Sequence, residues 1–265
     1  MKIALVGNPL RLSLSHILYA LISEMIGEKI DFFKLETENP FKALEFIKQE
    51  KMNGFFITMP YKRTFLSMFY EDEYVKKAMN INCVRIDDEK FFATNTDLIA
   101  LEKMMEIKGI DPSGRKCLII GNGCAAMTSI AIVSKLKAAE IILIARNHKK
   151  TEELKKLFKE IPLIEIEPAF NIKTDILINA TPLGMYDEFS ENLRIIYNSV
   201  IDFAYKEDET KIIKKAIEES KRFISGKELL VMQALYGLKH ISAKNFIDIY
   251  NELYPRFIKR IKESK

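Results

Sequence analysis

The sequence predicts an α/β protein with mainly parallel sheets, and three observations lead to this prediction. Strand-like runs alternate with segments of helical periodicity through most of the 265 residues, which is typical of parallel strands joined by crossover helices. The run at 116–120 ends in a glycine turn that opens a helix, the context found in nucleotide-binding folds. From about Gly226 onward the chain is helical in pattern to its last residue.

The first hundred residues are expected to form one domain around a βαβαβ unit. The expected strands are 2–7, 30–36 and 54–58. The expected helices are 15–26 and 40–50. Within the second helix the apolar residues Phe41, Leu44, Phe46 and Ile47 recur at helical spacing. Because each helix connects one strand to the next, the strands are expected to run parallel.

A second domain is expected to begin after residue 100. A helix around Ile99–Ile107 leads into GIDPSGRK, whose Gly, Pro, Ser and Asp residues are typical of a turn. The strands expected beyond it are 116–120, 141–146, 175–182 and 199–205. We therefore divide the chain into residues 1–100, 101–227 and 228–265, with the linking helix shared between the first two parts.

Composition excludes several classes of protein. Hydrophobic residues make up 48% and charged residues 29% of the chain, which are ordinary values for a folded globular protein. The net charge of +4 is too small to indicate a nucleic-acid-binding protein. No apolar stretch approaches the roughly 20 residues that span a bilayer, and the apolar start is too short for a signal peptide. We expect a soluble, cytoplasmic protein without nucleic-acid or membrane partners.

The cysteines and histidines do not indicate a disulfide framework or a metal site. Cys83, Cys117 and Cys124 are odd in number and lack CxxC spacing, so reduced thiols are expected. The histidines are widely separated and no HExxH motif occurs, so no metal is expected. Neither feature decides between a monomer and a homodimer.

The turn Gly121-Asn122-Gly123 is the first candidate functional feature. Two glycines between a strand and a helix allow a tight turn and a close approach to a pyrophosphate, and the helix N-terminus supplies N–H donors. An NAD site usually has an acidic residue about 20 residues further on, at the ribose. Here Arg146 leads a basic cluster instead, and a guanidinium suits a phosphate. The alternative, a solvated basic loop, is favoured for Lys149 alone, so NADP is the expected cofactor.

The segment Asn179–Gly184 follows another expected strand, at the edge where ligands bind in α/β folds. Pro182 and Gly184 indicate a stiff turn that could pack against a nicotinamide ring. Taken alone, the segment would be an ordinary loop.

Polar residues at strand ends of the first domain are candidates for binding a substrate. Ser13 and Ser15 lie close to the start of a helix, where Ser15 could be an N-cap or both hydroxyls could hold a carboxylate. The sequence leaves these two alternatives open.

Lys62 and Asp97 are the candidate catalytic residues. Lys62 follows the strand GFFIT, in which Pro60 prevents further strand pairing. Asp97 could be a helix cap or a first-turn acid. If the two side chains meet, the carboxylate can fix the lysine, which can then exchange a proton with the oxygen of a ketone under reduction.

The motifs SLS, ITMPYK, NTD, GNGCAA, AR, NATPLGM, DFAY and ELLVMQA, in this order, resemble those of the shikimate dehydrogenase family across essentially the whole chain. The resemblance implies an oxidoreductase that reversibly reduces 3-dehydroshikimate to shikimate with NADPH, in the biosynthesis of chorismate and the aromatic amino acids. It also implies a substrate domain, a Rossmann-type NADP-binding domain with the active site between them, and last helices that pack back on the substrate domain.

The resemblance assigns roles residue by residue. The implied catalytic pair is Lys62 and Asp97. The implied substrate-binding residues are Ser13, Ser15, Thr58, Asn82, Tyr205 and Gln233. The implied cofactor-binding residues are Gly121, Asn122, Gly123, Cys124, Ala125, Arg146, Lys150 and Thr181. For Gln233, a purely structural hydrogen bond would also satisfy a polar residue on an otherwise apolar helical stripe.

Several positions depart from the family pattern. Phe56 replaces an asparagine, and the other departures are Met79, Asn80, Leu98, Ala145 and Asn147. Phe56 leaves open a relative that acts on quinate or another cyclohexane hydroxy acid. It also leaves open a non-catalytic protein that senses NADP(H) or another ligand. The intact Lys62 and Asp97 favour an enzyme.

Overall fold

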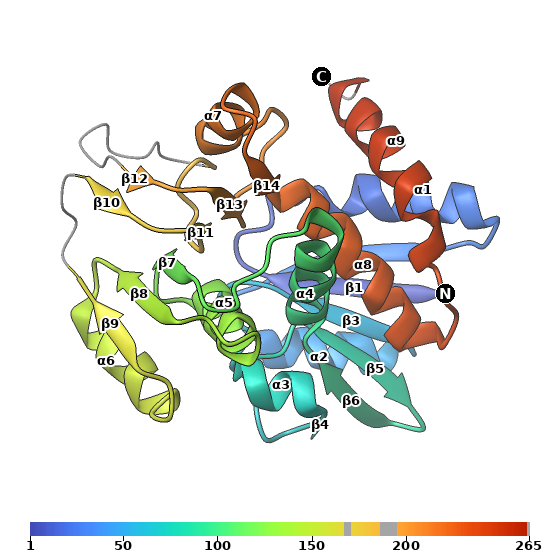
Figure 1. Cartoon of the computed structure of the whole chain (residues 1–265). Helices are drawn as coiled ribbons and strands as arrows, with labels where there is room; N and C mark the ends of the chain where they lie inside the picture. Colours follow the sequence, from blue (N-terminus) through green and yellow to red (C-terminus); the bar gives the residue numbers. More distant parts are fainter. Residues whose placement is uncertain (167–170, 186–194, 264–265) are drawn as a thin grey trace. The chain divides into compact units, whose positions relative to one another are not determined.

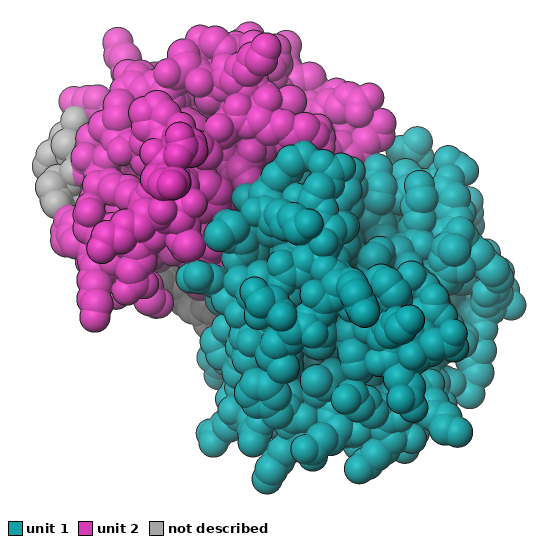
Figure 2. Space-filling model, turned by 90° about the horizontal axis from the view of Figure 1, so that it is seen from below, with its two compact units in different colours: residues 1–99, 230–265 teal, residues 100–229 magenta. Residues whose placement is uncertain are grey.

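The computed structural model describes residues 1–166, 171–185 and 195–263. The chain forms two compact units (Figure 2): unit 1 contains Met1–Ile99 and Leu230–Lys265, and unit 2 contains Ala100–Leu229. Two helices, α4 (Thr96–Lys108) and α8 (Gly226–Ser242), carry the chain from one unit into the other. No helix among the described residues is long and apolar enough to cross a membrane.

Unit 1 is built around one mixed sheet (Figure 1), whose strands follow the order β2-β1-β3-β5-β6-β4. The strands are β1 (Lys2–Gly7), β2 (Asp31–Glu36), β3 (Gly54–Ile57), β4 (Tyr70–Glu71), β5 (Cys83–Asp87) and β6 (Lys90–Thr94). The helices are α1 (Ser15–Ile26), α2 (Pro40–Gln49), α3 (Glu73–Ala78), α9 (Tyr250–Glu263), the short η1 (Ile247–Ile249) and parts of α4 and α8.

Strand β3 shows how the sheet is covered on both faces. Phe55 packs into a core with Ala43 and Ile47 of α2, whereas the next residue, Phe56, lies against Gly237 of α8 and Tyr19 of α1. Adjacent residues of a strand point to opposite faces, so two apolar layers need the unbroken apolar run of β3.

The strand directions bring four chain segments to one edge of this sheet. β1 and β3 are parallel, β3 and β5 are antiparallel, and β5 and β6 are antiparallel. The carboxyl ends of β1, β3 and β6 therefore meet at the same edge as the start of β5. Every segment of unit 1 with a predicted site residue, apart from α8, leaves or enters the sheet at this edge.

Unit 2 is a parallel sheet with the order β14-β13-β11-β7-β8-β9. Its strands are β7 (Lys116–Ile120), β8 (Glu140–Ile144), β9 (Leu163–Glu165), β11 (Ile176–Asn179), β13 (Ser199–Asp202) and β14 (Arg222–Ile224). A smaller pair is formed by β10 (Ile172–Lys173) and β12 (Ile195–Ile196). The helices are α5 (Cys124–Lys135), α6 (His148–Leu157), α7 (Lys211–Glu218) and parts of α4 and α8. In Figure 1, α5 and α6 cover one face of the sheet and α7 the other.

The order of the strands in unit 2 reverses between β7 and β11. From β7 the chain proceeds to β8 and β9 on one side, and then returns to β11, β13 and β14 on the other. Ligands of doubly wound folds bind at such a switch point, beyond the carboxyl ends of the strands. The predicted α/β class with mainly parallel sheets is confirmed.

The hairpin of β5 and β6 has no counterpart in the sequence prediction. Its two-residue turn consists of Asp88 and Glu89, whose φ angles of 45° and 61° are both positive. Turns of this kind favour Asn-Gly or Asp-Gly, so the sequence Asp-Glu does not signal a turn.

Candidate active site

Gly7 allows the end of β1 to approach the end of β3. A Cβ atom at Gly7 would lie 2.3 Å from Cγ2 of Thr58 and 3.0 Å from the carbonyl oxygen of Met59. The N–H of Asn8 donates to that same carbonyl over 3.0 Å. Thr58, a predicted substrate contact, is therefore held beside the loop that leads to Ser13.

Ser13 and Ser15 lie in the turn that starts α1. Ser15 is the first residue of the helix, and the preceding Leu14 makes no side-chain capping bond. The alternative in which Ser15 is the N-cap is therefore wrong. Instead, the N–H of Ser15 donates to Oγ of Ser13 over 3.3 Å. Ser15 is buried and Ser13 half-buried, so two hydroxyls gather at a helix N-terminus, where backbone N–H groups favour an anion.

Lys34 of β2 adds a positive charge beside these serines. Its Nζ donates to the carbonyl oxygen of Ser13 over 3.1 Å. Desolvation lowers the pKa of Lys34, and the nearby Glu36 acts in the opposite direction. A cation at this point suits a bound carboxylate. The sequence analysis missed Lys34, although its place near the end of β2, at the same sheet edge, could have drawn attention to it.

The side chains of Lys62 and Asp97 meet in an ion pair. Only 17% of the Lys62 side chain and 19% of the Asp97 side chain are exposed. The Lys62 backbone is fixed as well, because its carbonyl oxygen accepts from the N–H of Ile81 over 2.7 Å. The N–H of Leu98 donates to Oδ1 of Asn95 over 2.9 Å, so Asn95 caps this helix and Asp97 is a first-turn acid.

Asn82 and Gln233 are connected through Thr96. The N–H of Thr96 donates to Oδ1 of Asn82 over 2.7 Å, and Nδ2 of Asn82 lies 2.9 Å from Oγ1 of Thr96. Oγ1 of Thr96 also lies 3.4 Å from Oε1 of Gln233. Gln233 donates to the carbonyl oxygen of Leu230 over 3.0 Å, which is the structural bond anticipated as an alternative. Thr96 itself was missed, although it belongs to the NTD motif.

Phe56 forms an apolar layer next to these polar groups. It pairs with Cys83, the residue after Asn82, and is 4% exposed. A Cβ atom at Gly237 would lie 2.2 Å from its ring, so only glycine fits at that position of α8. Since Gly237 lies one helical turn after Gln233, the ring packs one layer beneath the predicted substrate contacts.

The glycine turn in unit 2 leads directly into α5. Gly121 has a φ of +114°, and a Cβ atom there would lie 2.8 Å from the carbonyl oxygen of Ala180. Gly123 is the N-cap, while Cys124 and Ala125 open the helix and are half-buried. The first turn of α5 contains no acidic residue. A helix N-terminus without acidic residues at a switch point fits the pyrophosphate of a dinucleotide.

Asn122 links the glycine turn to the loop after β8. Its Nδ2 donates to the carbonyl oxygen of Asn147 over 2.8 Å and lies 3.1 Å from Oγ1 of Thr151. Asn147 caps α6 by accepting from the N–H of Lys150 over 3.1 Å. The structure places Arg146 and Lys150 at the start of α6 with exposed side chains. Asn147 and Thr151 are the residues that hold this basic loop, and sequence reasoning did not assign them.

Thr181 lies against the glycine turn. A Cβ atom at Gly121 would be 2.9 Å from Cγ2 of Thr181, so the predicted pyrophosphate and nicotinamide segments are neighbours across the switch point. Tyr205, a predicted substrate contact, belongs to unit 2, where it follows β13 and is half-buried.

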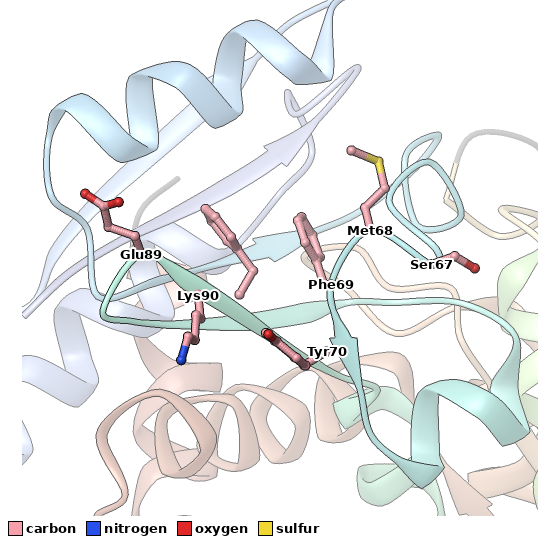
Figure 3. A pocket seen from close by; sticks show the side chains of 7 residues that line it. Ser67, Met68, Phe69, Tyr70, Glu89 and Lys90 are labelled. Atoms are coloured by element: carbon pink, nitrogen blue, oxygen red, sulfur yellow. The ribbon is translucent and has the colours of Figure 1, made fainter.

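A shallow pocket of about 330 Å³ in unit 1 lies outside these clusters. Figure 3 shows the side chains of Met68 and Phe69 pointing to one side and that of Lys90 to the other. No predicted site residue lines this pocket. The predicted site residues fall into two clusters, one at the sheet edge of unit 1 and one at the switch point of unit 2.

Comparisons with known proteins match both units. The family profile described as the shikimate dehydrogenase substrate binding domain matches residues 5–85. A relative from Caldicellulosiruptor bescii, named shikimate dehydrogenase (NADP(+)), is 29% identical over 97% of this chain and 96% of its own. Shikimate dehydrogenase 1 of Peptoclostridium difficile has the same fold, with a TM-score of 0.84, 22% identity and 98% of each chain covered.

A further relative decides the family. A protein of Clostridium beijerinckii, also named shikimate dehydrogenase (NADP(+)), is 34% identical over 77% of this chain and 77% of its own. This identity extends far beyond the profile of the substrate binding domain. The chain that brings Lys62 to Asp97 and a glycine turn to a switch point is therefore a member of the shikimate dehydrogenase family.

Proposed function

We propose that this chain is an NADP-dependent shikimate dehydrogenase, which reversibly reduces 3-dehydroshikimate to shikimate with NADPH. The observation that carries the proposal is the ion pair of Lys62 and Asp97 at the sheet edge of unit 1, in a chain of this family. In this proposal residues 1–100 and 228–265 bind the substrate, and residues 101–227 bind the cofactor.

The residues of unit 1 bind the substrate and move a proton. The Ser13 and Ser15 hydroxyls hold the carboxylate, with the charge of Lys34 beside them. Thr58, Asn82 and Gln233 contact the ring hydroxyls or the carboxylate. When bound, the cofactor supplies a hydride to the ketone carbon.

Lys62 donates its proton to the ketone oxygen as that oxygen becomes an alkoxide. The Asp97 carboxylate holds the ammonium group in place through their ion pair. The Lys62 side chain is mostly shielded, and its exposed 17% leaves a route for reprotonation from solvent. In the reverse direction Lys62 accepts the proton of the shikimate hydroxyl.

The residues of unit 2 suit the cofactor. The N–H groups at the α5 N-terminus, with Gly121 to Ala125, would hold the pyrophosphate, and Thr181 would contact the nicotinamide part of the cofactor. Arg146 and Lys150 supply the positive charge for the 2′-phosphate that distinguishes NADP from NAD.

The test follows reduced-nicotinamide absorbance with purified protein, using shikimate and NADP⁺, shikimate and NAD⁺, and quinate with each cofactor. We expect turnover with shikimate and NADP⁺. An Arg146→Ala variant should raise the KM for NADP⁺ about 10- to 100-fold, since a charge-assisted hydrogen bond contributes roughly 1.5–3 kcal/mol. Lys149→Ala is the matched control and should change KM by less than a factor of about three, as for a single solvated surface charge. Absence of turnover with shikimate and both cofactors would refute the proposal.

A quinate-like substrate range is the second candidate, and the buried ring of Phe56 favours it. An apolar layer in place of an amide removes a polar contact, which lowers discrimination between ring substituents. Faster turnover of quinate than of shikimate would support this candidate. Tight NADPH binding without turnover of either acid would instead support a sensor.

We further propose that the protein works in the cytoplasm as a monomer or homodimer. The free thiols Cys83, Cys117 and Cys124 support a reducing compartment, where cysteines stay unpaired. Light scattering during size exclusion would decide the oligomeric state.

A further inference from the structure

We propose that Asp202 is a positioning residue of the cofactor site, which acts through Asn179 to fix Thr181 and the turn after it. This inference rests on the proposed function, because it concerns the nicotinamide side of the NADP site. Asp202 and Asn179 are the last residues of the neighbouring strands β13 and β11 and are paired in register. Neither residue is among those predicted to contact substrate or cofactor.

The position of Thr181 at the switch point makes its orientation important. β7 and β11 are adjacent, and the glycine turn after β7 contacts Thr181 after β11. The side chain of Thr181 therefore forms one wall of the crevice in which a dinucleotide would lie. Any group that fixes this side chain also fixes that wall.

Asn179 binds both ends of the turn that contains Thr181. Its Oδ1 accepts from Oγ1 of Thr181 over 2.6 Å and from the N–H of Thr181 over 3.2 Å. Its Nδ2 donates to the carbonyl oxygen of Leu183 over 2.9 Å. Because the Thr181 hydroxyl donates to Asn179, its lone pairs accept from the N–H of Leu183 over 3.2 Å. The turn is thereby closed around one fully buried amide group.

Asp202 determines which way that amide group points. Nδ2 of Asn179 donates to Oδ1 of Asp202 over 2.7 Å. A carboxylate only accepts, so the amide must present nitrogen to Asp202 and oxygen to Thr181. A reversed amide would leave Asp202 facing an oxygen, and Thr181 would lose its acceptor. The carboxylate thus sets the direction of the hydroxyl of Thr181, which lies in the turn two residues after Asn179, the last residue of the neighbouring strand β11.

The carboxylate itself is rigidly held. The N–H of Ala204 donates to its Oδ1 over 3.0 Å, and Oγ1 of Thr210, at the start of α7, donates to its Oδ2 over 2.5 Å. Asp202 is fully buried, and desolvation raises its pKa to about 6, against the opposing effect of these three donors. A buried carboxyl held by three donors, with no atom at the surface, is suited to orienting neighbours rather than to contacting a ligand.

The experiment compares two ligands that differ in the part of the site they fill. NADPH reaches the nicotinamide side, whereas 2′,5′-ADP carries the adenosine phosphates and lacks the nicotinamide. Their Kd values are measured by nicotinamide fluorescence and by calorimetry on the full chain. For Asp202→Ala we expect the Kd for NADPH to rise about tenfold and the Kd for 2′,5′-ADP to stay within twofold. Asp202→Asn keeps an oxygen for Asn179 but turns an NH₂ toward Thr210, so it should show about a threefold rise.

Asp175→Ala is the matched control. Asp175 lies at the opposite end of β11, where it accepts from the N–H of Lys116 over 2.9 Å and from Nδ2 of Asn198 over 3.2 Å. Its loss also removes hydrogen bonds beside the same strand, one partly buried and one exposed, but far from Thr181. We expect both Kd values to remain within twofold of the wild type.

A double variant tests the route of the effect. If Asp202 acts through Asn179, adding Asp202→Ala to Asn179→Ala should not raise the Kd for NADPH further. Equal changes for both ligands, or no change in the ratio of the two Kd values, would overturn the proposal. Should Asp202→Ala fail to fold, the ratio measured on Asp202→Asn decides in the same way.

The binding assays separate this proposal from the proposed function. A wild type that binds neither NADPH nor 2′,5′-ADP would refute the NADP site as a whole. A wild type that binds both, together with an unchanged ratio in the Asp202 variants, would refute only the positioning role.

Discussion

Lys62 and Asp97 are the pair on which the proposed chemistry depends. Each side chain is less than a fifth exposed, so their attraction is weakly screened by solvent. The pair is also placed from both sides, by the Ile81 bond to the Lys62 backbone and by the Asn95 cap of α4. Such fixed geometry is what a proton donor to a developing alkoxide requires.

Replacing Lys62 should therefore affect turnover more than binding. We expect Lys62→Ala to lower kcat by about 10²- to 10⁴-fold, the usual contribution of a general acid or base, while the Kd for NADPH stays within twofold. Arg63→Ala, an exposed neighbour, is the control and should leave kcat unchanged. Steady-state kinetics and NADPH titration measure both quantities, and an undiminished kcat would remove Lys62 from the mechanism.

Asp202 gives a second prediction at the scale of a residue, concerning stability and pH. Desolvation by burial raises its folded-state pKa to about 6, from 3.8. At a pH below the unfolded-state pKa, the Asp202 carboxyl is protonated in both the folded and the unfolded state, so no charge is buried on folding. As the pH rises through the folded pKa, the buried carboxyl ionises and its contribution to the free energy of unfolding falls.

The contribution should fall by about 2 kcal/mol between pH 4 and pH 7, most of the roughly 3 kcal/mol that the full pKa shift represents at 1.36 kcal/mol per pKa unit. Asp202→Asn cannot ionise, so the difference in unfolding free energy between it and the wild type isolates this group. Urea denaturation of both proteins across this pH range measures the difference. If the difference in unfolding free energy between Asp202→Asn and the wild type does not change with pH, then Asp202 has the same pKa in the folded and unfolded states, and the prediction is wrong.

At the scale of elements, the packing of α8 on β3 explains why glycine stands at position 237. The Phe56 ring fills the space where a Cβ atom would lie, at 2.2 Å. Phe56 and Gly237 are both buried, so a clash between the ring and a Cβ atom at position 237 cannot be relieved by moving the ring into solvent.

Gly237→Ala should reduce the free energy of unfolding by about 1–3 kcal/mol, the usual effect of overpacking. The double variant Phe56→Leu with Gly237→Ala should recover part of that loss, because the shorter side chain vacates the space. Chemical denaturation of the single and double variants tests this coupling. Strictly additive losses would contradict direct contact between ring and helix.

The elements that could be predicted from sequence are those whose signals are local. α1 and α2 follow from apolar periodicity, and β3 and β7 follow from short apolar runs bounded by glycine or proline. The β5–β6 hairpin could not be predicted, since Asp88 and Glu89 adopt positive φ angles without a glycine. The short strands β9 and β14 contain three residues each, too few for periodicity to be informative.

The candidate site was predictable to the extent that single residues stand out. The position of Lys62 after an apolar strand, and the glycines before a helix, can be recognised from the sequence alone. Thr96, Asn179 and Asp202 are not visible in this way, because their importance comes from partners brought together by the sheet. Asn179 and Asp202, for example, are neighbours only because β11 and β13 pair in parallel.

At the scale of the whole molecule, the proposed function assigns the substrate to unit 1 and the cofactor to unit 2. The substrate cluster belongs to unit 1 and the turn that suits a pyrophosphate belongs to unit 2. Ligands that bind a folded region lower the population of its open state, which hydrogen exchange detects segment by segment. The assignment of substrate to unit 1 and cofactor to unit 2 can therefore be tested on the wild-type protein, without any substitution.

We expect NADP⁺ and shikimate, added separately, to protect different segments. NADP⁺ should slow exchange in segments of unit 2, at residues 119–128, 144–151 and 179–185. Shikimate should slow exchange in segments of unit 1, at residues 7–18, 56–65 and 80–98. 2′,5′-ADP serves as the control, because it should reproduce the protection at 119–128 and 144–151 but not that at 179–185, which adjoins the nicotinamide in the proposed site. Mass spectrometry of peptides from the intact chain measures all three patterns. Protection of unit 1 by 2′,5′-ADP, or of 144–151 by shikimate alone, would contradict the assignment of cofactor to unit 2 and substrate to unit 1.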